Sequence, residues 1–206
     1  SIKKVEFLGK TVLVRVDYNV SVKEGIISDD SRLRATLSTI KYLRENGAKI
    51  VLCSHLGRPD GKVVEELRLT PVGNRLSVLL NQPVQCLPNA IGDDVRDEIY
   101  SLQPGGILLL ENLRFYPGEE KNDEEFCKLL AEPVDLFVND AFGTAHRAHA
   151  STSGVTTLLP SYAGFLLERE VEMLSQVIQN PNRPLAAVMG GAKIGDKIPL
   201  IQNLLS

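Results

Sequence analysis

The stretch "TVLVRVD", residues 11 to 17, indicates the kind of fold that this chain adopts. It is short, rich in β-branched residues, and its first positions do not alternate between polar and apolar side chains. This pattern is typical of a strand that is buried on both faces, as in parallel sheets covered by helices on each side. We therefore expect a parallel sheet with this strand in its interior.

A helical period follows this strand after a turn-rich stretch. The segment "DDSRLRATLSTIKYLRENG" (29–47) predicts a helix that Asp30 or Ser31 caps and that Gly47 ends. Its apolar stripe consists of Leu33, Leu37, Ile40 and Leu43. A helix of this kind buries one side against the sheet.

Strand and helix patterns then alternate along the chain. Further strands are expected in "AKIVLCS" (48–54), "PVQCL" (83–87), "GGILLLEN" (105–112) and "VDLFVND" (134–140). Helices are expected from Thr70-Pro71 onward, around 92–102 and in "EKNDEEFCKLLAE" (120–132). This alternation predicts an α/β fold: a Rossmann-like three-layer α/β/α arrangement with a mostly parallel sheet.

The last part of the chain behaves differently. "YAGFLLEREVEMLSQVIQN" (162–180) predicts one long helix, and Pro181 and Pro184 follow it. Residues 185–206 then begin a new strand, glycine turn and helix, which cannot bury a core by themselves. We expect a first domain at 1–155, a linking helix and linker at 156–184, and the truncated start of a second α/β domain at 185–206.

The composition excludes several classes of protein. The chain has 206 residues and a net charge of −3, so an anion site requires local clustering, and a general nucleic-acid binder is disfavoured. Its 3 cysteines lack CxxC spacing, which favours a reduced, cytoplasmic protein. No apolar run approaches the ~20 residues of a membrane span. We expect neither nucleic acid nor membrane as a partner.

Polar and basic side chains follow the predicted strands. In parallel α/β sheets, ligands collect beyond the carboxyl ends of the strands, and guanidinium groups bind phosphate or carboxylate oxygens in pairs of hydrogen bonds. The residues expected at this edge are Asp17, Asn19, Arg32, His55, Arg58, Arg114, His146, Arg147 and His149. Together they predict a pocket for a multiply charged anion.

Each of these residues also has a structural interpretation. An arginine after a strand is commonly a solvated loop residue, and His55 could cap or pack. The two histidines beside Arg147 could hydrogen-bond a tight loop, and Asp17 and Asn19 could close a turn. The pocket interpretation depends on all of them reaching one edge of the sheet.

A second motif is "MGGAKIGDK", residues 189 to 197. Glycines between a strand and a helix N-terminus can cradle a phosphate, and Lys193 and Lys197 would share a helix face. The motif is not a Walker A loop, because Asp196 takes the position of the lysine, and it is not GxGxxG. A plain tight turn is the alternative interpretation.

Long motifs identify a resemblance. "RVDYN" (15–19), "SHLGRPDG" (54–61), "LLENLRFYPGEEKND" (109–123), "FVNDAFGTAHRAHASTSGV" (137–155), "AGFLLERE" (163–170) and "GGAKIGDKI" (190–198) follow the order and spacing of the phosphoglycerate kinase family. The resemblance covers the whole chain and half of a family member. It implies two Rossmann-like domains and reversible phosphoryl transfer, in glycolysis, between 1,3-bisphosphoglycerate and ADP, giving 3-phosphoglycerate and MgATP.

The resemblance also assigns roles to residues. It implies that Asp17 and Asn19 contact the glycerate end of the substrate, and that Arg32 and Lys193 act on the transferring phosphoryl group. The residues that would complete the substrate pocket are His55, Arg58, Arg114 and Arg147. Those that would contact the nucleotide are Gly190, Gly191, Lys193 and Lys197. Magnesium would enter with the nucleotide, no residue would be a covalent nucleophile, and the protein would be a monomer.

The sequence departs from the family pattern at some points. Tyr18 stands where Phe is usual and Ser21 where Pro is usual, and neither change removes a ligand. The rest of the nucleotide domain does not follow Ser206, so the chain is expected to keep the 3-phosphoglycerate site without being a competent kinase. Two other functions are alternatives, a non-catalytic anion-binding module and a nicotinamide-dependent dehydrogenase. The second lacks GxGxxG after the first strand.

Overall fold

The computed structural model describes residues 1–179 and, beyond them, positions 184, 186, 188, 198 and 202. The chain divides into two compact units, Ser1–Leu167 and Glu168–Ser206. The first unit contains the sheet that the sequence predicts. Among the described residues, no helix has both the length and the apolar character to cross a membrane.

A six-stranded sheet forms the centre of the first unit, in the order β5-β6-β4-β1-β7-β8, with every pairing parallel. Its strands are β1 (Thr11–Arg15), β4 (Lys49–Cys53), β5 (Gln85–Cys86), β6 (Ile107–Leu109), β7 (Leu136–Asn139) and β8 (Ser161–Ala163). Strand β1 lies between β4 and β7, and all its residues are buried. The predicted interior position of this strand is confirmed.

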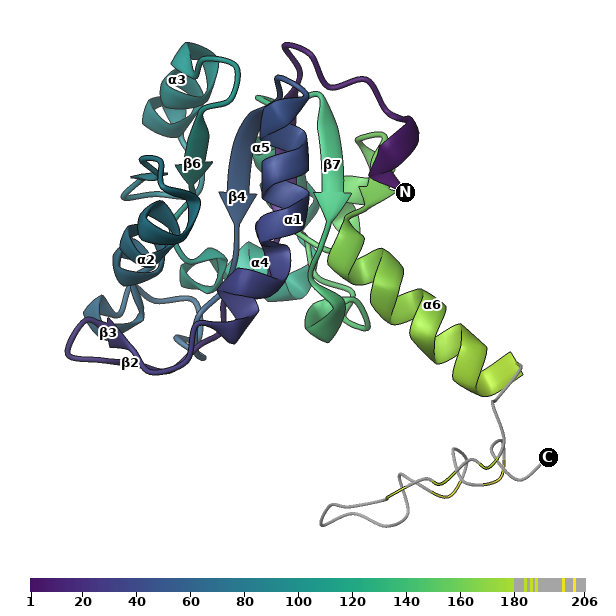
Figure 1. Cartoon of the computed structure of the whole chain (residues 1–206). Helices are drawn as coiled ribbons and strands as arrows, with labels where there is room; N and C mark the ends of the chain where they lie inside the picture. The colour runs from purple at the N-terminus through teal and green to yellow at the C-terminus, as the bar shows by residue number, and fades with distance from the viewer. Residues whose placement is uncertain (180–183, 185, 187, 189–197, 199–201, 203–206) are drawn as a thin grey trace. The chain divides into compact units, whose positions relative to one another are not determined.

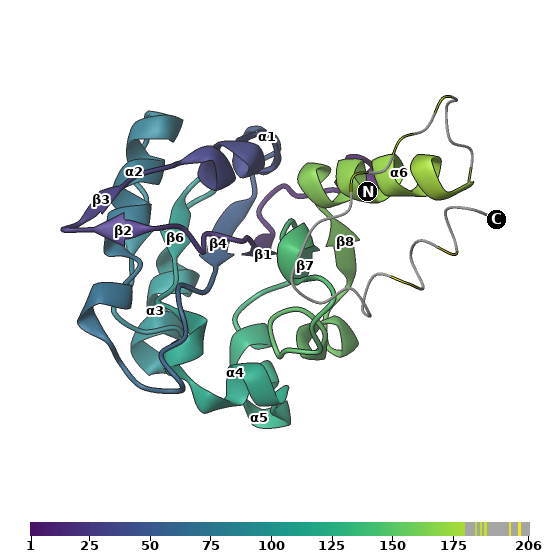
Figure 2. The ribbon, with the colours of Figure 1, turned by 90° about the horizontal axis from the view of Figure 1, so that it is seen from below.

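Helices cover both faces of the sheet (Figures 1 and 2). They are α1 (Ser31–Glu45), α2 (Thr70–Leu80), α3 (Asp93–Ser101), α4 (Pro117–Lys121) and α5 (Glu124–Ala131). The last described helix, α6 (Phe165–Gln179), begins at the end of the first unit and continues into the second. Val12 and Val14 of β1 share a core with α1 and α2, whereas Leu13 joins the core that contains residues of α3 and α5. Successive strand residues point to opposite faces, so one buried strand contributes to both cores. The predicted three-layer α/β fold is confirmed.

Several local predictions need correction. The segment 120–132 is not one helix, because Asn122 adopts a left-handed conformation with φ 53° and Asp123 caps a new helix, α5. Tyr162 belongs to β8 rather than to the long helix, which begins at Phe165. A short antiparallel hairpin, β2 (Val22–Lys23) and β3 (Ile26–Ile27), lies in the turn-rich stretch, where the sequence pattern predicts no strand.

The first helix differs from its prediction only at the cap. Leu33 and its partners on the stripe are buried or partly buried, and Gly47 follows the helix with φ 74°. Asp30 occupies the N-cap position, but its carboxylate makes no capping bond and instead accepts hydrogen bonds from Arg34 and Arg75. Instead, Asp29 stabilises the first turn of the helix, because its Oδ1 accepts a hydrogen bond from Ser31 N at 2.8 Å.

Candidate anion-binding site

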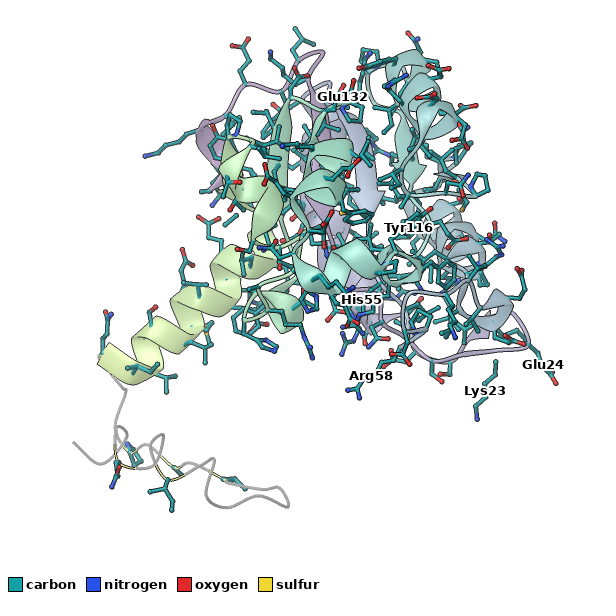
Figure 3. The ribbon with its side chains drawn as sticks, turned by 180° about the vertical axis from the view of Figure 1, so that it is seen from behind. Lys23, Glu24, His55, Arg58, Tyr116 and Glu132 are labelled. Atoms are coloured by element: carbon teal, nitrogen blue, oxygen red, sulfur yellow. The ribbon has the colours of Figure 1, made fainter. Side chains whose placement is uncertain are left out.

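The predicted site residues leave the sheet at its carboxyl edge. Asp17 and Asn19 follow β1, His55 and Arg58 follow β4, Arg114 follows β6, and Arg147 follows β7. Figure 3 places His55 and Arg58 at this lower edge, whereas Glu132 lies at the opposite end of the molecule's first unit. Because β1 is hydrogen-bonded to both β4 and β7, and β4 to β6, the loops after these strands are neighbours.

The backbone of Gly57 joins three of these loops. Asn19 Oδ1 accepts a hydrogen bond from Gly57 N at 2.9 Å. On its other side, the carbonyl oxygen of Gly57 accepts from Arg114 Nη1 at 2.8 Å. Gly57 has φ 65°, and a Cβ there would lie 2.8 Å from Leu67 Cδ2, so glycine suits both the backbone conformation and the packing. Asn19 and Arg114 therefore organise the site as well as face it.

Asp17 connects the first helix with the loop after β7. Its carboxylate pairs with Arg32, which lies in the first turn of α1. This carboxylate offsets a cation at an unfavourable end of the helix dipole. On the other side, a Cβ at Gly143 would lie 2.6 Å from Asp17 Oδ2, which shows how closely the β7 loop approaches. Arg32 keeps 49% of its side chain exposed and remains accessible to a ligand.

The arginines of the site lie in two settings. Arg114 is 6% exposed, and burial lowers the pKa of its guanidinium. The carboxylate of Glu120 raises this pKa, whereas the positive charge of Arg147 lowers it further. Its Nε lies 3.1 Å from Glu120 Oε1 but without hydrogen-bond geometry. Arg58 and Arg147 are exposed. The candidate site thus contains one buried arginine and two exposed arginines.

His55 is a buried histidine that carries no charge near neutral pH. Its pKa falls to about 2, first because of burial and then because of the positive charges of Arg15 and Arg114. Arg15 Nη2 lies 3.1 Å from His55 Nδ1. The sequence prediction included His55 but missed Arg15, the last residue of β1, although a charged residue inside an apolar strand is a signal in itself.

The histidine-rich loop forms a tight turn, and its binding role stays a prediction. His146 and Arg147 are exposed, as a ligand-facing loop requires. His149 is partly buried, and its carbonyl oxygen accepts from Ser153 N at 2.8 Å within a tight turn. Thr152 Oγ1 adds a hydrogen bond of 2.6 Å to the carbonyl oxygen of Arg147. Burial lowers the pKa of His149, whereas the nearby glutamates raise it.

A spacious groove lies away from this cluster. It measures about 540 Å³ and runs between the β2–β3 hairpin and α2. Its arginine, Arg75, donates to Asp30 Oδ2 from Nε at 2.8 Å and from Nη2 at 2.6 Å. Since two carboxylates, Asp29 and Asp30, line this groove beside Arg75, the groove is a poor place for an anion, and the candidate anion site is the arginine cluster at the sheet edge.

Other predicted residues cannot be placed. Gly190, Gly191, Lys193 and Lys197 lie outside the described residues, so their proposed nucleotide contacts stay predictions. Within the described part of the chain, no group of at least 3 His, Cys, Asp or Glu residues is arranged to hold a metal ion.

A parallel sheet that gathers guanidinium groups from several loops at its carboxyl edge defines an α/β domain for small anionic ligands. Comparison with known proteins narrows this class. The family model described as phosphoglycerate kinase matches residues 2–206, and the chain belongs to this family.

Curated relatives and solved structures agree with this assignment. Phosphoglycerate kinases from Borreliella burgdorferi, strains ZS7 and B31, are each 55% identical over 210 residues, which cover 100% of this chain and 53% of theirs. The chain therefore spans about half the length of the curated relatives it matches. The structure of phosphoglycerate kinase from Coxiella burnetii has a TM-score of 0.87 and 43% identity, covering 99% of this chain and 51% of that one. The enzyme from Pyrococcus horikoshii OT3 has a TM-score of 0.89 and 38% identity, covering 99% and 52%.

Proposed function

We propose that this chain is the substrate-binding part of a phosphoglycerate kinase that transfers a phosphoryl group between 1,3-bisphosphoglycerate and ADP. The observation that carries the proposal is the joined site at the sheet edge, where Asn19 and Arg114 both hold Gly57 while exposed arginines stand around them. A ligand with two anionic ends, such as 3-phosphoglycerate, matches several guanidinium groups spread over separate loops.

The described geometry suggests distinct roles within this site. Asp17 and Asn19 face the glycerate end, where a carboxylate and an amide can hydrogen-bond a hydroxyl group. His55, Arg58, Arg114 and Arg147 bind the anionic groups. Arg32, which is half exposed beside Asp17, neutralises charge on the phosphoryl group in transfer together with Lys193. Catalysis by positioning and charge neutralisation requires no covalent nucleophile from this chain.

The glycine motif would bind the nucleotide. Gly190, Gly191 and Lys197 would contact its phosphates, and Mg²⁺ would arrive with ATP or ADP as part of the co-substrate. In this proposal residues 1–155 form the glycerate-binding domain, 156–184 the linking segment, and 185–206 the start of the nucleotide-binding domain. The working protein would be a cytoplasmic monomer that needs no nucleic-acid or membrane partner.

The 206-residue chain itself provides the test. By calorimetry we expect it to bind 3-phosphoglycerate, to bind MgATP weakly or not at all, and not to bind NAD. A coupled assay should detect no phosphoryl transfer by this chain alone. Binding of NAD, or of MgATP more tightly than 3-phosphoglycerate, would contradict the assignment of the site.

A further inference from the structure

A buried ionic cluster lies directly behind the anion site. Arg15 ends β1 with 1% of its surface exposed, and Glu119 of α4 and Ser151 are fully buried. Arg15 occupies the same side of the strand as Leu13, since side chains alternate, and this side faces the core that contains residues of α5. A buried cation of this kind is costly unless other groups compensate it.

Ser151 bridges the two charged side chains. Arg15 Nε donates to Ser151 Oγ at 2.7 Å, and the same hydroxyl donates to Glu119 Oε1 at 2.6 Å. Ser151 N also donates to Glu119 Oε2 at 3.0 Å. The direct separation between Arg15 Nη2 and Glu119 Oε1 is 4.0 Å. With a further bond from Arg15 to the carbonyl oxygen of Val16, the guanidinium is held in one orientation.

This orientation directs Nη2 of Arg15 at His55 Nδ1, 3.1 Å away. A guanidinium group can only donate hydrogen bonds, so Nδ1 must be the acceptor in this pair. A neutral imidazole carries a single proton, which must then lie on Nε2. No hydrogen bond from a described residue occupies Nε2 of His55, and the ring belongs to the loop that follows β4 at the site.

We propose that Glu119, Ser151 and Arg15 are positioning residues that hold His55 as its neutral Nε2–H tautomer, so that this nitrogen donates a hydrogen bond to an anionic oxygen of the ligand. The identity of that ligand, 3-phosphoglycerate, rests on the proposed function. His55 is then a donor in the site and not a base.

The charges around His55 support a neutral donor. Positive charge approaches it from Arg15, Arg114 and Arg147, and His149 also faces it. Glu119, the compensating carboxylate, lies beyond Arg15 and is 4.0 Å from His149 Nδ1. Burial and these cations disfavour protonation of His55, so it adds a hydrogen bond without adding a charge to a crowded cationic site.

Nitrogen-15 NMR of the imidazole rings in the 206-residue chain tests the tautomer directly. We expect His55 to show one protonated nitrogen, Nε2, and an acceptor Nδ1 throughout about pH 5.5–8, because burial disfavours the doubly protonated ring. Saturation with 3-phosphoglycerate should shift the Nε2 resonance. A ring that is protonated on Nδ1, or on both nitrogens at about pH 6.5, would overturn the proposal.

A double variant tests the role of the cluster. Arg15→Met with Glu119→Gln removes both buried charges together, which avoids an unpaired ion. We expect mixed His55 tautomers and a Kd for 3-phosphoglycerate raised about tenfold, the size of one hydrogen bond to an ion. The matched control makes the same two changes at the exposed pair of Arg96 and Glu132, 3.9 Å apart, and should leave the Kd within about twofold.

The outcomes separate this proposal from the proposed function. A double variant that keeps the pure Nε2–H tautomer and the wild-type Kd refutes the positioning role. If the double variant does not fold, the wild-type spectrum and its response to 3-phosphoglycerate decide. A wild-type ring with the expected tautomer but no response to 3-phosphoglycerate refutes the proposed function, while the tautomer itself still supports control of His55 by the cluster.

Discussion

Four arginines at the carboxyl edge form two pairs, one buried and one exposed, whereas Arg32 is half exposed and already paired with Asp17. Arg15 and Arg114 are almost fully buried, and each of their guanidinium groups is engaged by protein atoms. Arg58 and Arg147 are exposed, and within the described part of the chain neither guanidinium has a hydrogen-bonded side-chain partner. Burial commits a guanidinium to the protein, whereas exposure leaves its fork of donors free for a ligand.

This difference predicts whether a substitution affects stability or ligand binding first, and Arg114, which is buried and also proposed to bind the ligand, should affect both. A buried arginine loses hydration and needs compensation from within the protein, so changing its partners should affect stability first. An exposed arginine gives little stability, so changing it should affect the ligand first. The predictions below compare the two groups.

The largest effect is expected at the buried group. Glu119→Gln keeps the shape of the side chain but leaves Arg15 without its compensating carboxylate, so the free energy of unfolding should fall by about 3–5 kcal/mol. Urea denaturation followed by circular dichroism measures this loss. Glu120→Gln is the control, because that carboxylate is 46% exposed beside Arg114 and should contribute only about 0–1 kcal/mol. Equal losses at both positions would contradict the comparison.

The next effect concerns the exposed group. Arg147→Lys keeps a positive charge but loses the planar fork, so binding of 3-phosphoglycerate should weaken by about 1–3 kcal/mol. Because Arg147 is exposed, the unfolding midpoint should hardly change. Calorimetric titration of the folded variant measures the affinity. An unchanged Kd would return this loop to a purely structural role.

A pH titration of the folding stability tests the buried histidine, His55. The pKa of His55 falls to about 2 in the folded protein, below its unfolded value of about 6.5. The unfolded chain therefore binds more protons in this range, and stability is lost as pH falls below about 6.5, by up to about 1.4 kcal/mol per pH unit. The groups facing His55 are Arg15, Arg114, Arg147 and His149, and they oppose its protonation.

Denaturation at several pH values between 5 and 7.5 provides the measurement. His55→Gln should remove this part of the slope, even if its absolute stability is lower. A slope that survives in His55→Gln would show that another group carries it.

The features that the sequence predicted well depend on local patterns. β1 was recognisable because its apolar residues serve two cores, and the stripe of α1 because its period matches a helix. β8 was missed because the pairing of Phe137 and Val138 with Ser161 and Tyr162 defines it, and three residues carry no strand pattern of their own. The break between α4 and α5 does have a local signal, Asn122 followed by the capping Asp123.

In the candidate site too, the sequence predicts some residues and misses others. Asp17, His55 and Arg114 were predictable because the ends of parallel strands meet at one edge of the sheet. Glu119 and Ser151 were missed because they come from segments far from β1 in sequence and meet Arg15 only in the folded core. Arg15 alone could have been found, since a charge inside a strand that is buried on both faces must have a partner.

The smallest expected effect comes from salt. Raising NaCl from about 0.05 M to about 0.5 M shortens the Debye length from ~14 Å to ~4 Å. Binding of 3-phosphoglycerate depends partly on the exposed arginines, so its Kd should rise about threefold across this range. The stability difference between wild type and Glu119→Gln should stay constant, because Arg15 and Glu119 are buried and salt ions hardly screen a buried pair. Calorimetry and urea denaturation at the same salt concentrations measure both quantities. If salt erased the stability difference and left the Kd unchanged, the division into a buried and an exposed group of arginines would be wrong.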